Sequence, residues 1–134
     1  MSDPAASGNY ASSFRDLRVY QAALDLASAV FEASASFPRE EKFSLTDQIR
    51  RSARSISANI AEAWGKRRYP AAFVAKLSDS LSETFETQAW LDHSLRHSYI
   101  TDETFRALDN HCASIGGMLR AMENKADSFC GPVS

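Results

Sequence analysis

The chain of 134 residues has a mass of 14.8 kDa, the size of one ordinary domain, and we expect a single folded unit. A composition of 44% hydrophobic and 24% charged residues excludes collagen-like and wholly disordered proteins. With 15 Lys or Arg against 17 Asp or Glu, the net charge of −2 excludes a uniformly basic nucleic-acid-binding protein. Any basic site must therefore be local.

The two ends of the chain have the composition of tails. We expect a disordered N-terminal tail over 1–13, a folded region over 14–129 and a frayed C-terminal tail over 130–134. No apolar run approaches the ~20 residues that cross a bilayer, and no export signal opens the chain. Cys112 and Cys130 are too few for a disulfide framework. These features predict a cytoplasmic protein with no membrane contact.

The first two predicted helices occupy residues 14–36 and 44–65. Apolar residues at spacings of three and four, from Phe14 through Phe31, predict the first helix, which Pro38 ends. Ser44 is the predicted N-cap of the second helix. Gly65 is its predicted C′ residue, because glycine takes a positive φ without a steric clash. The core face of this helix is predicted to contain Leu45, Ile49, Ala53, Ile56, Ile60 and Trp64.

Pro70 and Thr101 begin two further predicted helices, as an N1 proline and as an N-cap. In the third helix the predicted core stripe has nearly heptad spacing and consists of Phe73, Leu77, Leu81, Phe85, Gln88, Leu91 and Leu95. In the fourth helix it consists of Phe105, Leu108, Cys112, Ile115, Leu119 and Met122. Gly116 and Gly117 destabilise a helix, so we expect a neighbouring backbone to approach them closely.

Four helices with short connections predict an all-α, antiparallel up-down-up-down four-helix bundle. No stretch alternates apolar and polar residues for more than a few positions, and no Asn-Gly or Asp-Gly hairpin signal is present. A sheet is therefore not expected.

Basic residues concentrate in the second predicted helix and the segment after it. Residues 48–78 contain seven Lys or Arg and one acid, whereas residues 79–109 contain seven acids and two Arg. The candidate nucleic-acid-binding residues are Arg50, Arg51, Arg54, Lys66, Arg67, Arg68, Tyr69 and Lys76.

Three interpretations of this basic segment stay open. It can hold phosphates. It can also be an ordinary solvated surface, in which Arg51 pairs with Asp47 and the cations of residues 66–68 are stabilised by the C-terminus of the helix. It can also face the acidic stretch of another subunit in a head-to-tail ring. Asn59, Glu62 and Trp64 are candidates for fixing register within the bundle or between subunits, with simple solvent exposure of Asn59 and Glu62 as the alternative.

No catalytic signature is present. The chain has no glycine-rich phosphate loop, no G-x-S-x-G and no H-E-x-x-H, and it lacks the Glu-x-x-His pairs of di-iron bundles. His93 and His97 are four apart, but two ligands are too few for a structural zinc site. We expect no enzyme activity, no cofactor and no metal.

Three runs carry a family resemblance: FRDLRVYQAA (14–23), QIRRSARSISANIAEAWGKRRY (48–69) and SDSLSETFETQAWL (78–91). The most specific pattern is R-R-x-x-x-S-I-x-x-N-I-A-E, which begins at Arg50. These runs resemble the four-helix-bundle family first noticed as reading frames in intervening sequences of bacterial large-subunit ribosomal RNA genes. The resemblance implies a ring-like homo-oligomer, often a pentamer. It also implies kinship with the accessory proteins of diversity-generating retroelements, which bind a reverse transcriptase and RNA or DNA.

The leading functional hypothesis is a non-enzymatic, nucleic-acid-associated accessory protein. In it, the basic region from Arg50 to Arg68 of a homo-oligomer binds RNA or DNA phosphates, and a reverse transcriptase becomes a candidate partner if its gene is adjacent. The alternative is a protein-interaction scaffold in which the same arginines contact acidic surfaces of sister subunits or of another protein.

Overall fold

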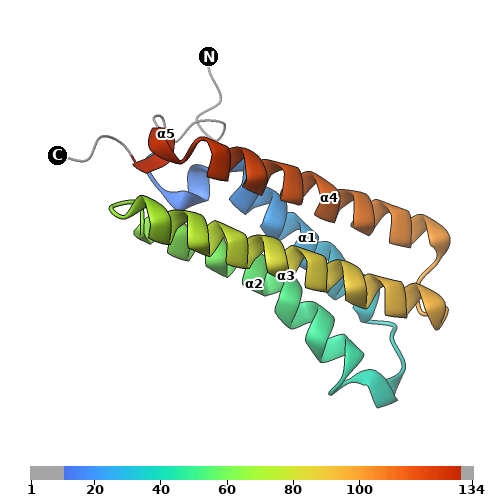
Figure 1. Cartoon of the computed structure of the whole chain (residues 1–134). Coiled ribbons are helices and arrows are strands. Elements are labelled where there is room, and N and C mark those ends of the chain that lie inside the picture. Colours follow the sequence, from blue (N-terminus) through green and yellow to red (C-terminus); the bar gives the residue numbers. More distant parts are fainter. Residues whose placement is uncertain (1–10, 131–134) are drawn as a thin grey trace.

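A computed structural model describes residues 11–130, and this part of the chain is helical throughout, without a strand. Figure 1 shows four long helices side by side, α1 (Arg18–Ser34), α2 (Leu45–Gly65), α3 (Pro70–Arg96) and α4 (Asp102–Asn124). A short helix, α5 (Ala126–Cys130), and two 3-10 turns, η2 (Phe14–Asp16) and η3 (Arg39–Glu41), complete the described chain. The predicted all-helical class is confirmed.

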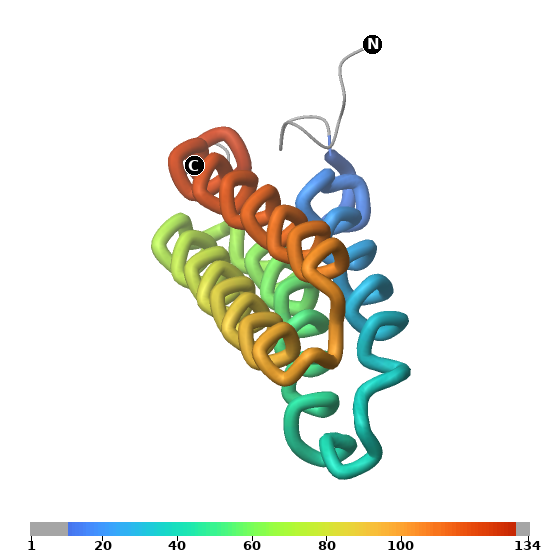
Figure 2. The backbone as a smooth tube through the Cα atoms, turned by 90° about the vertical axis from the view of Figure 1, so that its right-hand side faces the viewer, coloured from blue at the N-terminus to red at the C-terminus, as the bar shows by residue number. Residues whose placement is uncertain are grey.

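α2 and α3 run in opposite directions, since rising residue numbers in one pair with falling numbers in the other. Residues 52 and 56 of α2 are hydrogen-bonded to residues 87 and 80 of α3. The α1–α2 and α3–α4 connections lie at one end of the bundle (Figure 2). The α2–α3 turn and α5 lie at the other end, where the rings of Phe73 and Phe129 stack with centroids 6.0 Å apart.

The N-terminal boundary differs from the prediction, because α1 begins at Arg18 and not at Phe14. Ser13 and Asp16 form a reciprocal capping box around η2, and Leu17 is extended. The backbone and hydroxyl of Ser12 also donate to Asp16, and these hydrogen bonds lower the pKa of its carboxyl. Residues 11–13 therefore belong to the fold, whereas the predicted tails over 1–10 and 131–134 lie outside the described residues.

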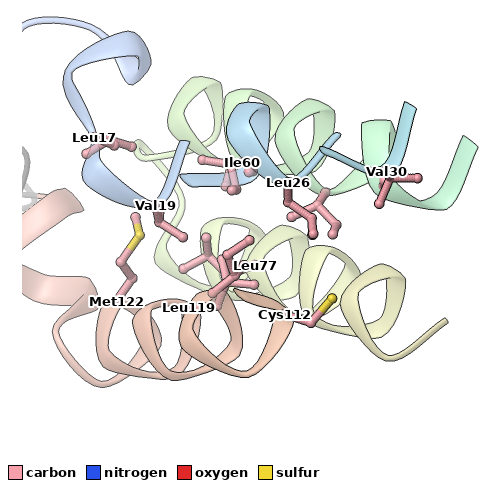
Figure 3. Packing of buried hydrophobic residues seen from close by; sticks show 14 of the residues in the cluster. Leu17, Val19, Leu26, Val30, Ile60, Leu77, Cys112, Leu119 and Met122 are labelled. Carbon is pink, nitrogen blue, oxygen red and sulfur yellow. The ribbon is translucent and has the colours of Figure 1, made fainter. Parts of the chain in front are cut away.

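The four long helices share one hydrophobic core. Figure 3 shows Leu26 and Ile60 together with Leu77 and Leu119, so that each long helix contributes a buried side chain. Cys112 is also in this core, and burial raises the pKa of its thiol to about 12. The side chain acts there as a small apolar residue.

The seam between α2 and α3 corrects the predicted stripe of α3. Leu81, Gln88 and Leu95 are only half-buried, and Phe85 is 52% exposed. The positions buried in their place carry small hydroxyl side chains, namely Ser80, Thr84, Thr87 and Ser94. Small residues permit two helices to approach closely, and the aliphatic side chains are turned toward the edges of the seam.

Hydrogen bonds satisfy these buried hydroxyls. Ser80 Oγ donates to the Ile56 carbonyl of α2 at 2.9 Å, and Ser52 Oγ and Thr87 Oγ1 are hydrogen-bonded at 2.8 Å. The hydroxyl of Thr84 donates to the carbonyl four residues earlier in its own helix. Burial of these polar groups is therefore compatible with stability.

The predicted starts of α2, α3 and α4 are confirmed, but the capping of α2 differs from the prediction. Ser44 is the N-cap residue of α2, but its hydroxyl accepts from no helix amide; it donates at 2.6 Å to Glu41 Oε1, and the Glu41 carboxylate accepts from the Leu45 amide. Gly65 remains helical, with Lys66 as the C-cap. Thr101 caps α4 by accepting from the Thr104 amide at 3.1 Å, as predicted.

The expected close approach of a backbone to the glycine pair is also wrong. A Cβ atom on Gly116 would meet only the Leu81 side chain, at an ordinary 3.5 Å, and one on Gly117 would meet nothing within 4 Å among the described residues. Nothing in the described chain requires glycine at position 117.

Gly117→Ala is expected to raise the free energy of unfolding by about 1 kcal/mol, because alanine loses less backbone entropy in a helix. Thermal and urea unfolding measure this change. Gly116→Ala serves as the comparison, with an equal or smaller gain since its new methyl group would contact Leu81. A loss of stability in Gly117→Ala would contradict this description of α4.

Ser80→Ala is expected to lower the free energy of unfolding by about 1 kcal/mol, the typical contribution of one hydrogen bond. Ser80→Leu is expected to lower the free energy of unfolding further, by about 1–3 kcal/mol, because the larger side chain overpacks the seam against α2. Urea titration of both variants tests the seam, and a Ser80→Leu protein as stable as the native chain would show that α2 and α3 are not in close contact there.

Candidate nucleic-acid interface

The predicted basic residues fall into two groups at different ends of α2. Arg50 and Arg54 lie in its first half, and Lys66 to Arg68 follow its last residue. Sixteen helical residues separate Arg50 from Lys66, which corresponds to ~24 Å along the axis. The sequence therefore identified one basic segment that the fold divides into two surfaces.

The first group contacts the C-terminal part of α1. Arg50 Nε donates to Ser34 Oγ at 2.8 Å, and its Nη2 donates to the Phe31 carbonyl at 3.3 Å. The guanidinium groups of Arg50 and Arg54 lie 4.2 Å and 5.8 Å from the centroid of the Phe31 ring. An aromatic face and the carbonyls of a helix end both attract cations, which explains how two arginines share this position.

A groove runs beside this arginine pair on the outer face of α1 and α2. Its volume is about 590 Å³, and Leu24, Ala27, Ser28, Phe31, Glu32, Arg54 and Ser57 line it. Phe31 is 46% exposed and Leu24 38% exposed, although both belong to the apolar pattern of α1. This surface was not predicted from the sequence. The signal was present, since Val30 and Phe31 are adjacent and only one of them can face the core.

The second group forms the four-residue turn between α2 and α3, which we call the cationic turn (residues 66–69). Arg67 lies flat on the indole of Trp64, with 3.4 Å between guanidinium carbon and ring centroid, and its Nε donates to the Trp64 carbonyl at 2.9 Å. Lys66 and Arg68 are exposed, and Tyr69 is 61% exposed. Burial against the indole lowers the pKa of Arg67, but a guanidinium remains charged at neutral pH.

No ion pair neutralises the cationic turn within residues 11–130. Lys66, Arg67 and Arg68 have no carboxylate within 4 Å there. The turn is also fixed in shape, because the Tyr69 amide donates to the Lys66 carbonyl at 2.9 Å and Pro70 starts α3. Three cations and one exposed ring are thus presented together.

The remaining basic candidates lie beside acidic groups of α3. Lys76 Nζ is 3.5 Å from Glu62 and 3.7 Å from Asp79, so its charge is already compensated. Burial and the neighbouring Glu86 raise the pKa of Glu83, while the charge of Arg51 opposes that rise. In the described chain Arg51 makes no ion pair with Asp47, the pairing that the sequence offered as an alternative.

The three register candidates have different surroundings. Glu62 joins α2 to α3 through Lys76. Asn59 Nδ2 donates to the Ser55 carbonyl of its own helix at 2.9 Å, and its side chain borders a depression together with Ser82, Glu83 and two further acids of α3. Trp64 is half-buried against the core beneath Arg67. Only Glu62 makes a polar link between two helices.

The described residues contain neither a metal-binding cluster nor a membrane-spanning helix. Among residues 11–130 there is no group of three His, Cys, Asp or Glu side chains arranged to hold a metal ion. No helix in this range has the length and apolar character needed to cross a membrane.

Comparison with known proteins identifies the family. No curated protein matches the chain. A crystal structure of a protein of unknown function from the S23 ribosomal protein family of Bacteroides thetaiotaomicron VPI-5482 is 33% identical, with a TM-score of 0.71 over 79% of this chain and 95% of that one. The family model described as 23S rRNA-intervening sequence protein matches residues 15–121, and the chain therefore belongs to the 23S rRNA-intervening sequence protein family.

Proposed function

We propose that this protein is a non-enzymatic accessory protein that binds RNA or DNA through the cationic turn. The assembly that binds is a homo-oligomer of up-down-up-down bundles, and the family resemblance favours a pentameric ring. Binding depends on phosphate charge and is tolerant of sequence, since the turn offers cations without a pattern of amide groups for reading bases.

One observation carries the proposal: within residues 11–130, Lys66, Arg67 and Arg68 have no carboxylate partner, while Lys76, nearly two turns into α3, has two. Because the backbone of the turn is fixed, only side chains lose conformational entropy when a phosphate binds. Tyr69 adds an exposed aromatic ring on which an unpaired base can stack. Repetition of the turn around an oligomer would multiply a weak individual contact.

Arg67→Ala/Arg68→Ala is expected to weaken binding of single-stranded RNA and to reduce the slope of log affinity against log salt by about 1.4, which is about 0.7 for each lost cation on a single strand. Fluorescence anisotropy over a range of salt concentrations gives both quantities. The matched control is Arg96→Ala/Arg106→Ala, which removes two exposed arginines elsewhere on the bundle.

Arg50→Ala/Arg54→Ala distinguishes the two groups of cations. Because Arg50 and Arg54 already contact Phe31 and the end of α1, their removal is expected to affect RNA binding less than removal of Arg67 and Arg68. Absence of RNA and DNA binding at low salt would overturn the nucleic-acid proposal, as would equal losses in the turn variant and the Arg96/Arg106 control.

The groove between α1 and α2 supports the alternative role as a protein-interaction scaffold. Exposed Leu24 and Phe31 lie beside Arg54, a combination of apolar and cationic groups that is typical of subunit contacts. On this basis we assign the groove to contacts between copies of the chain and the cationic turn to nucleic acid.

Phe31→Glu is expected to lower the mass of the assembly in solution, because it places a charge in the groove while leaving the core of the bundle unchanged. Light scattering coupled to size-exclusion chromatography measures the mass. Phe85→Glu is the matched control, since Phe85 is similarly exposed but lies near Arg120, outside the groove. Equal masses for Phe31→Glu and the native protein would remove the groove from the oligomer contact.

A further inference from the structure

A second cavity lies at the opposite end of α2 from the cationic turn. Its volume is about 530 Å³, within the range of small-ligand sites. Side chains of the η3–α2 connection and of the last turns of α3 form its walls, and the ones used below are Glu41, Phe43, Trp90, His93 and His97. Neither the basic group at Arg50 nor the cationic turn contributes to it.

The carboxylate of Glu41 forms part of one wall of this cavity, and hydrogen bonds hold it in position. Glu41 Oε1 accepts from the Ser44 hydroxyl at 2.6 Å and from the Leu45 amide at 3.4 Å, while Oε2 accepts from the Tyr99 hydroxyl at 2.9 Å. The hydrogen bonds from Ser44 and Tyr99 lower the pKa of Glu41, so that the group is ionised at neutral pH. Three donors from two different segments hold the anion in place before any ligand arrives.

Aromatic rings form much of the remaining surface. Phe43 is 86% exposed, more than any other large apolar residue of the described chain, and Lys42 Nζ lies 5.4 Å from its ring centroid. The Trp90 and His93 rings are neighbours, with centroids 5.8 Å apart. Trp90 Nε1 is the one buried side-chain nitrogen or oxygen in residues 11–130 without a hydrogen-bond partner. Because this nitrogen is itself buried, the proposed binding does not involve it.

The composition of the walls defines the charge of the ligand. No Lys or Arg lines the cavity, whereas it contains an ionised carboxylate, two imidazoles and exposed aromatic faces. Aromatic faces and carboxylates both attract cations, and a neutral imidazole offers an acceptor nitrogen to an N–H donor. An anionic ligand would meet the Glu41 carboxylate with no Lys or Arg in the lining.

We propose that this cavity binds a guanidinium or ammonium group on an extended stem, with the cation against Glu41 and the stem along Phe43 and Trp90. Two sources share this chemistry: the side chain of an arginine or lysine in a polypeptide, and a free organic amine. The site does not depend on nucleic-acid binding, because its walls and the cationic turn are separated by the length of α2, ~30 Å.

Titration of the full-length protein followed by amide NMR shifts tests the proposal with two probes. One is agmatine, and the other is an amidated peptide with the sequence of residues 64–71, which contains one lysine and two arginines. We expect saturable shifts near Phe43 and Trp90 with a dissociation constant of about 1 mM or below. Tighter binding of the peptide identifies a polypeptide source, and equal binding identifies a small cation.

Two variants connect the shifts to the cavity. Glu41→Gln is expected to weaken binding about fivefold, the effect of losing one exposed ionic contact. Because Glu41 also holds the start of α2, Phe43→Ala provides a second variant whose exposed side chain makes folding insensitive to its removal. Glu40→Gln, the adjacent carboxylate outside the lining, is the matched control. Absence of saturable shifts with both probes, or equal affinities for the native protein and both cavity variants, would overturn the proposal.

Discussion

Close contact between α2 and α3 is the constraint on which the surfaces of this protein depend. The two helices meet through serine and threonine side chains whose hydroxyls are hydrogen-bonded within the seam. Because these small residues occupy the centre of the contact, larger side chains such as Phe85 lie at its margins. The other flank of α2 packs on α1, so the arginines of α2 can occupy only the two outward edges that remain. The two groups of cations are separated by the length of α2: Arg50 and Arg54 lie beside α1 in its first half, and the cationic turn follows its last residue.

Each end of α2 consequently has its own electrostatic character. At its C-terminal end, three cations that have no carboxylate partner within residues 11–130 precede an exposed tyrosine in the turn. At its N-terminal end, the Glu41 carboxylate is held by Ser44 and Tyr99 beside aromatic rings. Between them Arg50 is directed toward α1, and Lys76 is compensated by Glu62 and Asp79. The net charge of −2 for the whole chain gives no indication that opposite charges are separated along α2 in this way.

Periodicity and local signals predicted where each helix lies in the sequence more accurately than which of its side chains contact the neighbouring helices. Pro70 and Thr101 marked helix starts to the residue, because a fixed φ and a capping hydroxyl act locally. The same reasoning misassigned Phe85 to the core, since a heptad stripe gives no information on how closely a neighbouring helix approaches. The charge count also grouped Arg50 with Arg68, although most of the length of α2 lies between them and Arg68 is in the turn that follows the helix. The partner of Glu41, Tyr99, is 58 residues away and was not predictable from spacing.

The positions of the first and last described elements determine where a label can be attached without disturbing the cationic turn. η2 and α5, the first and last elements of the described chain, both lie at the end of the bundle that carries the cationic turn (Figure 1), and Val19 and Phe129 border a shared pocket there. A label attached at residue 11 or residue 130 would therefore lie on the side proposed to bind phosphate, where a polyhistidine or acidic tag would alter the local field. Immobilisation through an engineered residue in the α3–α4 connection would leave that side facing solution.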